Sequence, residues 1–111
     1  MSENCIFCKI RDKIISTDIV FENEKMFIIK DINPQAKLHF LMIPKKHFAF
    51  LSDMNDHDAA DLGQCFKTLA KIAPDLGLKN GFRTIINQGE DGNQTVFHLH
   101  IHVLGGEKLL H

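Results

Sequence analysis

Hydrophobic and polar positions form short runs near both ends of the chain that are typical of β-strands. The last two runs alternate apolar and polar residues with a period of two, and the others are mostly apolar, as in buried strands. The pattern predicts five strands, at Ile19–Glu22, Met26–Asp31, His39–Pro44, Phe82–Asn87 and Phe97–Leu104. Short polar or glycine-containing stretches separate these runs, as expected for turns and loops.

The middle of the chain changes to helical spacing. Apolar residues recur there at steps of three and four: Leu62, Cys65, Phe66, Leu69, Ile72 and Ala73. Asn55 or Asp56 is the expected cap of this helix, and Pro74 is expected to end it. A shorter helical turn is expected at Cys5–Arg11. One long helix among strands predicts an α+β domain, with an antiparallel sheet of about five strands packed on the helix by one face.

Length and composition fit one domain covering residues 1–111, with 44% hydrophobic residues and nine phenylalanines to fill a core. The net charge of −1 gives no reason to expect nucleic-acid polymers or anionic membranes as partners. We expect no signal peptide in the opening residues, no membrane span and a cytoplasmic location. Three cysteines, an odd number, do not favour a disulfide framework.

The segment His98–Val103 alternates three histidines with three apolar residues. On a strand, His98, His100 and His102 would share one face while Leu99, Ile101 and Val103 enter the core. Histidine changes charge near neutral pH. A row of three therefore indicates a metal site, an acid–base relay or a nucleophile with supporting groups.

This histidine pattern and its flanking motifs resemble the histidine triad (HIT) family, in particular its Hint-like branch of purine nucleoside phosphoramidases. The flanking motifs are residues 31–36, 40–47, 87–89 and 91–97, followed by the pattern itself at 98–106. The resemblance runs from about Ile6 to Gly106. It implies a HIT-like fold whose exposed sheet edge is covered by a two-fold homodimer.

The resemblance also implies roles for four histidines. His100 would be the nucleophile, attacking the α-phosphorus of a nucleotide to form a covalent nucleotidyl-histidine. His102 would donate hydrogen bonds to the phosphate, and a second role in passing a proton to the leaving amine stays open. His98 would orient the site, and His39 would support the other histidines.

Further residues match the family's nucleotide site. Asp31 would bind the ribose hydroxyls, and Asn87 would place an amide near the phosphate or the nucleoside. A phosphate loop would include Asn93, where many relatives have glycine, together with Gln94 and Thr95. Apolar residues would surround the base: Ile6, Phe7, Ile10, Ile29 and Ile32. Without the resemblance, Asp31 and Asn87 are equally explained as turn residues, and the apolar set as core.

The pair Cys5 and Cys8 forms a Cys-x-x-Cys motif, which indicates metal binding or a redox dithiol, or simply two buried thiols. A zinc-bearing subset of the family has two such cysteines, the histidine corresponding to His47, and the first triad histidine, here His98. The resemblance therefore implies structural Zn²⁺ at these four residues, with no cofactor required for the chemical step. Cys65 is expected to belong to the core.

The leading interpretation is hydrolysis of the P–N bond in purine nucleoside 5′-phosphoramidates, releasing AMP or GMP and an amine. A diadenosine polyphosphate hydrolase using the same nucleophile is the alternative enzyme, and comparing the two substrates separates them. A zinc hydrolase with the triad as its metal site would lose turnover when its metal is removed. A non-catalytic nucleotide-binding or protein-interaction module would bind AMP without turnover.

Overall fold

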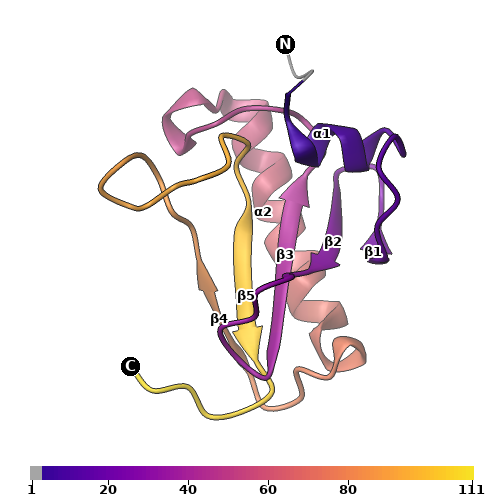
Figure 1. Ribbon diagram of the computed structural model, residues 1–111, viewed down its shortest axis with the longest axis vertical. Helices are drawn as coiled ribbons and strands as arrows, with labels where there is room; N and C mark the ends of the chain where they lie inside the picture. The colour runs from indigo at the N-terminus through magenta and orange to yellow at the C-terminus, as the bar shows by residue number, and fades with distance from the viewer. Residues whose placement is uncertain (1–3) are drawn as a thin grey trace.

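Five antiparallel strands form one sheet in the computed structural model, which describes residues 4–111 (Figure 1). The strands are β1 Ile19–Glu22, β2 Met26–Lys30, β3 Leu38–Pro44, β4 Phe82–Ile85 and β5 Ile101–Gly105. Their order across the sheet is β1-β2-β3-β5-β4. The predicted α+β architecture is therefore confirmed, and β5, which carries the last histidine of the triad, is an interior strand flanked by β3 and β4.

The long helix α2, Asp56–Ile72, covers one face of the sheet (Figure 1). Its cap is Asn55, whose side-chain oxygen accepts a hydrogen bond from the Asp58 N–H at 2.8 Å. The helix gives way to a 3₁₀ turn, η2 Ala73–Leu76, that contains Pro74, as the sequence predicts. Another 3₁₀ turn, η1 Leu51–Asp53, precedes α2 in the chain. Within residues 4–111, no helix has the length and hydropathy needed to cross a membrane.

The core between α2 and the sheet is made of side chains that alternate along the strands. Met42 of β3, Ile101 and Val103 of β5, and Leu69 of α2 are fully buried there. Leu99 joins the same cluster. The prediction that Leu99, Ile101 and Val103 point into the core is therefore confirmed, and it leaves the opposite face of the sheet for the histidines.

A short helix, α1 Ile6–Arg11, lies over this opposite face, near the end of the sheet where β3 finishes and β5 begins (Figure 1). It buries Phe7 and Ile10 against apolar side chains of β2 and β3: Phe27, Ile29, Leu41 and Ile43. A helix of only six residues is not stable alone in water. Burial of these two side chains therefore holds α1 in place.

Three predicted strands are longer than the observed ones, and the second of the five exceeds its observed length by a single residue, since it ends at Lys30 rather than Asp31. The last strand begins at Ile101 rather than Phe97, because its ladder with β3 ends at the Met42–Ile101 pair. The strand predicted at Phe82–Asn87 ends at Ile85, which pairs with His102. His98 and His100 consequently precede the strand, in a segment where the Leu99 N–H donates to the Phe48 carbonyl at 2.7 Å instead of to a neighbouring strand.

Candidate functional site

A cavity of about 550 Å³ lies on the α1 side of the sheet. This volume is in the usual range for small-molecule sites. All ten residues predicted for nucleotide binding line it: Ile6, Phe7, Ile10, Ile29, Asp31, Ile32, Asn87, Asn93, Gln94 and Thr95. Three histidines line it as well, namely His39, His100 and His102. The fold therefore brings residues from four separate sequence motifs around one space.

One part of the cavity wall is apolar. It comes from α1, β2 and β3, through the buried residues Phe7, Ile10, Ile29 and Leu41. Ile6 and Ile32 also line the cavity but are 45% and 92% exposed, so they lie at its rim. A bound flat, apolar group such as a nucleobase would shield these apolar side chains from water.

His100 is oriented by the backbone of its own segment. Its Nδ1–H donates to the carbonyl oxygen of His98 at 2.8 Å. A carbonyl can only accept, so this bond fixes the proton on Nδ1 and leaves a lone pair on Nε2 when the ring is neutral. The ring is buried, and the edge of Phe7 packs against it with ring centroids 5.1 Å apart. His100 thus presents a nucleophilic nitrogen in a fixed orientation.

His39 and His102 form a hydrogen-bonded pair beside it. The Gln35 backbone N–H donates to His39 Nδ1 at 3.0 Å. The proton of neutral His39 is therefore on Nε2, which lies 2.9 Å from His102 Nδ1. This arrangement makes His102 Nδ1 an acceptor and places the His102 proton on Nε2. Burial, and then the charges of the neighbouring His100 and His39, lower the pKa of His102, which favours the same neutral form.

The Asp31 carboxylate lies next to three groups, the Asn33 N–H and the rings of His39 and His102. Its Oδ1 accepts a hydrogen bond from the Asn33 N–H at 2.7 Å, closing the turn after β2. Its Oδ2 lies 3.4 Å from His39 Nε2 and 4.0 Å from His102 Nδ1. Although these three side chains lie close enough to bind a metal ion, a metal on His39 Nε2 would require the proton on Nδ1, where the Gln35 N–H already donates. The hydrogen-bonded pair explains the cluster better.

The segment from Gly89 to Val96 forms a loop at the edge of the cavity. Gly92 is required by close packing, since a Cβ there would lie 2.5 Å from the Gln88 carbonyl oxygen. Asn93 adopts a positive φ of 59°, which asparagine tolerates better than most residues. The predicted loop thus has a left-handed residue, Asn93, directly after Gly92.

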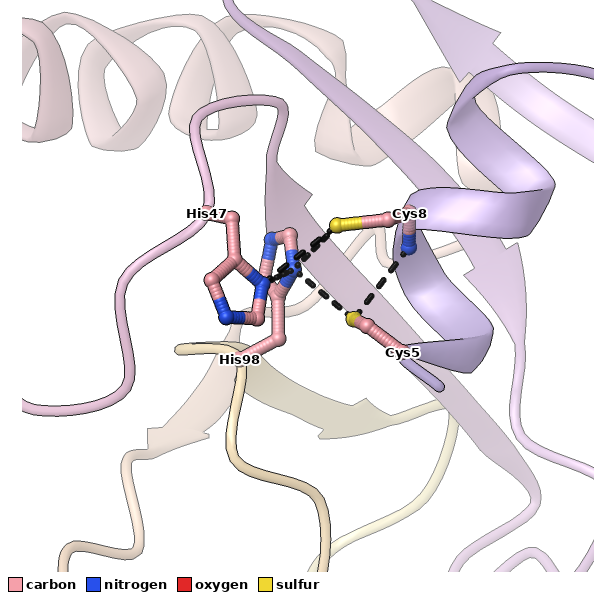
Figure 2. A group of neighbouring side chains, drawn as sticks. All are labelled: Cys5, Cys8, His47 and His98. Atoms are coloured by element: carbon pink, nitrogen blue, oxygen red, sulfur yellow. Dashed lines mark hydrogen bonds between the residues drawn. The ribbon is translucent and has the colours of Figure 1, made fainter. Parts of the chain in front are cut away.

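A second cluster lies next to Phe7, whose ring contacts both His98 and His100. Figure 2 shows Cys5 and Cys8 facing His47, which follows β3, and His98, which precedes β5. The Sγ atoms of Cys5 and Cys8 lie 3.3 and 3.5 Å from His98 Nδ1. Cys8 Sγ lies 3.3 Å from His47 Nδ1. One possible ligand atom from each of the four residues lies within 4.8 Å of the others, so the group can hold a metal ion.

The backbone prepares His98 as a ligand. Its Nε2–H donates to the Pro44 carbonyl at 2.7 Å, which leaves the Nδ1 lone pair facing the two sulfur atoms. Burial lowers the pKa of His98 to about 4, so the ring is neutral at neutral pH, as a ligand must be. A metal site therefore explains the arrangement of Cys5 and Cys8 better than two buried thiols do.

The three histidines of the triad do not belong to one site. His98 is 0% exposed and belongs to the cysteine cluster, whereas His100 and His102 line the cavity. Phe7 contacts the rings of both His98 and His100 and stands between the two groups. Within the described residues, the three histidines do not converge on a common point as metal ligands, which argues against a triad-bound zinc.

Several cavity-lining residues were not predicted: Ile15, Thr17, Lys30, Asn33, Gln35, Leu41 and Val96. Leu41 and Val96 look like ordinary core residues in the sequence. Gln35 contributes through its backbone N–H, which no side-chain pattern reveals.

Comparison with known proteins agrees with this geometry. Residues 12–109 match the model of the HIT domain. Protein HitA of Neisseria gonorrhoeae is 48% identical over 103 residues, covering 93% of this chain and 96% of its own length.

Two solved structures show the same fold. A HIT family hydrolase from Legionella pneumophila superposes with a TM-score of 0.89 at 41% identity, covering 96% of each chain. A Zn-bound histidine triad family protein from Mycobacterium smegmatis superposes with a TM-score of 0.81 at 32% identity, covering 96% of this chain and 78% of that one.

Proposed function

This chain belongs to the HIT domain family, and from that premise we propose that it hydrolyses the P–N bond of purine nucleoside 5′-phosphoramidates. The observation that carries the proposal is His100, whose fixed tautomer leaves a nucleophilic nitrogen in a nucleotide-sized cavity. The name of the Legionella pneumophila structure, a HIT family hydrolase, supports hydrolysis in general. The choice of a P–N bond rests on the resemblance to the Hint-like branch.

The first chemical step would use His100 as the nucleophile. A bond forms between His100 Nε2 and the α-phosphorus, the P–N bond of the substrate breaks, and the amine leaves with a proton taken from solvent. The phosphorylated ring keeps its Nδ1–H on the His98 carbonyl, which stabilises the positive charge on the imidazole. In the second step water attacks the phosphorus, the bond to His100 breaks, and the proton released by that water returns to solvent.

His102 would act as a hydrogen-bond donor in both steps. Because His39 donates to its Nδ1, the remaining N–H of His102 is on Nε2 and can bind a phosphate oxygen as charge develops. The lowered pKa of His102 in the free protein favours this neutral donor over a protonated general acid.

The rest of the cavity would hold the nucleoside. The Asp31 carboxylate would accept hydrogen bonds from the ribose hydroxyls, and the apolar wall around Phe7, Ile10 and Ile29 would cover the purine. Half-buried Asn87 has no hydrogen bond to another described residue, so its amide is available to a ligand.

We further propose that the four-residue cluster binds a structural zinc ion. A tetrahedral zinc ion separates two nitrogen ligands by about 3.3 Å, and a sulfur from a nitrogen by about 3.6 Å. The corresponding distances here are 3.1 Å between His47 and His98, and 3.3 to 3.5 Å between sulfur and nitrogen. Two thiolates and two imidazoles suit zinc and fill its four positions, so bound zinc would supply structural support rather than an activated water.

Metal analysis of untagged protein tests the zinc proposal. We expect about one zinc ion per chain, as in a closed four-ligand site. A stoichiometry far below one would contradict it.

We also propose a homodimer. Phe82 and Ile85 lie on the edge strand β4, and each is 37% exposed. A second copy would cover such an edge. Sedimentation at several protein concentrations is the test, and a monomer at all of them would contradict the proposal.

The experiment for the reaction compares an adenosine 5′-phosphoramidate with a diadenosine polyphosphate. Faster turnover of the phosphoramidate supports the proposal, and faster turnover of the dinucleotide favours the alternative hydrolase. Tight AMP binding with turnover of neither would indicate a binding module.

A further inference from the structure

Gln94 has an unusual environment for a glutamine in a loop. It is only 7% exposed, and its side-chain amide makes three hydrogen bonds within the protein. Its Oε1 accepts from the Gly89 N–H at 2.9 Å, and its Nε2 donates to the carbonyls of Ala49 and Val96 at 2.9 and 3.1 Å. Both N–H bonds of the amide are therefore used. Gln94 lines the cavity but has no side-chain donor left for a ligand.

These bonds close the loop from Gly89 to Val96. The Gln94 side chain reaches Gly89 at the start of the loop and Val96 at its end, and the Gln94 N–H donates to the Gly89 carbonyl at 3.0 Å. The bond to Ala49 ties the same loop to the segment after His47. Removing this one amide would leave two carbonyls and one N–H without their partners at once.

The loop held in this way leaves hydrogen-bond donors unused at two residues that line the cavity. Within residues 4–111, the backbone N–H groups of Thr95 and Val96 have no hydrogen-bond partner, and neither does the Thr95 hydroxyl. Both residues line the cavity together with His100. Adjacent backbone N–H groups without a partner in the protein are a typical receptor for an anion.

We infer that Gln94 is a positioning residue for the phosphate: it holds the loop so that the donors of Thr95 and Val96 face the phosphoryl group, and it does not itself contact the nucleotide. This inference rests on the proposed nucleotide site. The phosphate contribution to the binding free energy then depends on the loop, and the nucleoside contribution depends on α1 and the sheet. Loss of the Gln94 amide should therefore weaken binding of nucleotides but not of nucleosides.

The test is the affinity of the metal-loaded protein for AMP and for adenosine, measured by isothermal titration calorimetry. Gln94→Met keeps an unbranched side chain of similar length without the amide. Gln64→Met, on the exposed surface of α2, makes the same chemical change away from the cavity. We expect Gln94→Met to lower the AMP affinity about tenfold or more, with adenosine changed by less than about twofold and Gln64→Met like wild type.

Other outcomes overturn the inference. An equal loss for AMP and adenosine would show that Gln94 only maintains the fold, and an unchanged AMP affinity would show that the loop does not need it. A wild-type affinity for AMP no greater than for adenosine would contradict the proposed nucleotide site itself, and the inference with it.

A second variant keeps the test available if Gln94→Met does not fold. Gly92→Ala places a Cβ 2.5 Å from the Gln88 carbonyl oxygen, so the loop has to shift while the Gln94 amide remains. The expected result is again a loss of affinity for AMP but not for adenosine. A wild-type affinity for both ligands would overturn the inference.

Discussion

Replacing His39 by phenylalanine tests how the cavity histidines are organised. The variant keeps an aromatic ring of similar size in a buried position and removes both ring nitrogens. The Gln35 N–H then loses its acceptor at 3.0 Å, and His102 Nδ1 loses its donor at 2.9 Å. Without that donor, nothing fixes the His102 proton on Nε2, and the tautomer that can donate to the phosphate is no longer the favoured one.

The size of the effect follows from these two bonds. A hydrogen bond of this type contributes about 1 to 1.5 kcal/mol, and 1.4 kcal/mol corresponds to about a tenfold change in rate. We therefore expect kcat for an adenosine phosphoramidate to fall about tenfold in His39→Phe. The free energy of unfolding should fall by about 1 to 3 kcal/mol, because two polar groups lose their partners.

The assay is steady-state turnover of a fluorogenic phosphoramidate, with nitrogen NMR of the His102 ring as a direct readout of its tautomer. The matched control is His57→Phe, since His57 lies on α2 with its side chain 83% exposed. A His39→Phe variant with wild-type kcat and with the His102 proton still on Nε2 would show that His39 does not set the His102 tautomer.

Three further predictions concern the sugar, the metal and an ion-pair cluster. Asp31→Asn should lower the affinity for AMP about tenfold, because the ribose hydroxyls lose a charged acceptor. The affinity for 2′,3′-dideoxy AMP, which lacks these hydroxyls, should fall much less. Equal losses for the two ligands, measured by calorimetry, would contradict the ribose assignment. Removing metal with a chelator under reducing conditions should lower Tm by at least about 5 °C in a thermal melt, and an unchanged Tm would contradict a structural metal. Hydrogen bonds from Lys13 and Lys45 lower the pKa of Glu22 from 4.5 to about 2, so their stabilisation is present above pH 4.5 and is lost as the pH falls toward 2. Glu22→Gln should therefore flatten the pH dependence of unfolding by urea over this range, and an unchanged slope would exclude the effect.

The elements of this fold are largely predictable because hydrophobic periodicity decides them locally. The helical spacing from Leu62 to Ala73 and the alternation around Ile101 each determine which side chains are buried, wherever the rest of the chain lies. Strand ends are different, because they depend on where two neighbouring segments separate. β3 continues to Pro44, but the Leu99 N–H donates to the Phe48 carbonyl, so the pairing of β3 with β5 ends at Met42 and Ile101. The sequence of β5 itself contains no sign of this limit.

The candidate site could likewise be predicted from the sequence only in part. The order of the motifs predicted a group of residues, and all the predicted nucleotide-binding residues line one cavity. Their individual roles depend on hydrogen bonds that the sequence does not display. The Gln35 N–H sets the tautomer of His39, and the hydrogen bonds of the Gln94 amide go to its own loop and to Ala49. Hydrogen bonds to the backbone carbonyls of Pro44 and His98 likewise orient His98 and His100, so that His98 faces the cysteines while His100 lines the cavity.

The proposed hydrolysis depends above all on His100 acting as the nucleophile. The most direct measurement is turnover of an adenosine 5′-phosphoramidate with a fluorogenic amine by wild type and by His100→Asn. We expect turnover in wild type and a loss of about a thousandfold or more in the variant, because the attacking nitrogen is removed. Equal turnover in both proteins would contradict the nucleophile, and turnover in neither would contradict P–N hydrolysis of such a substrate.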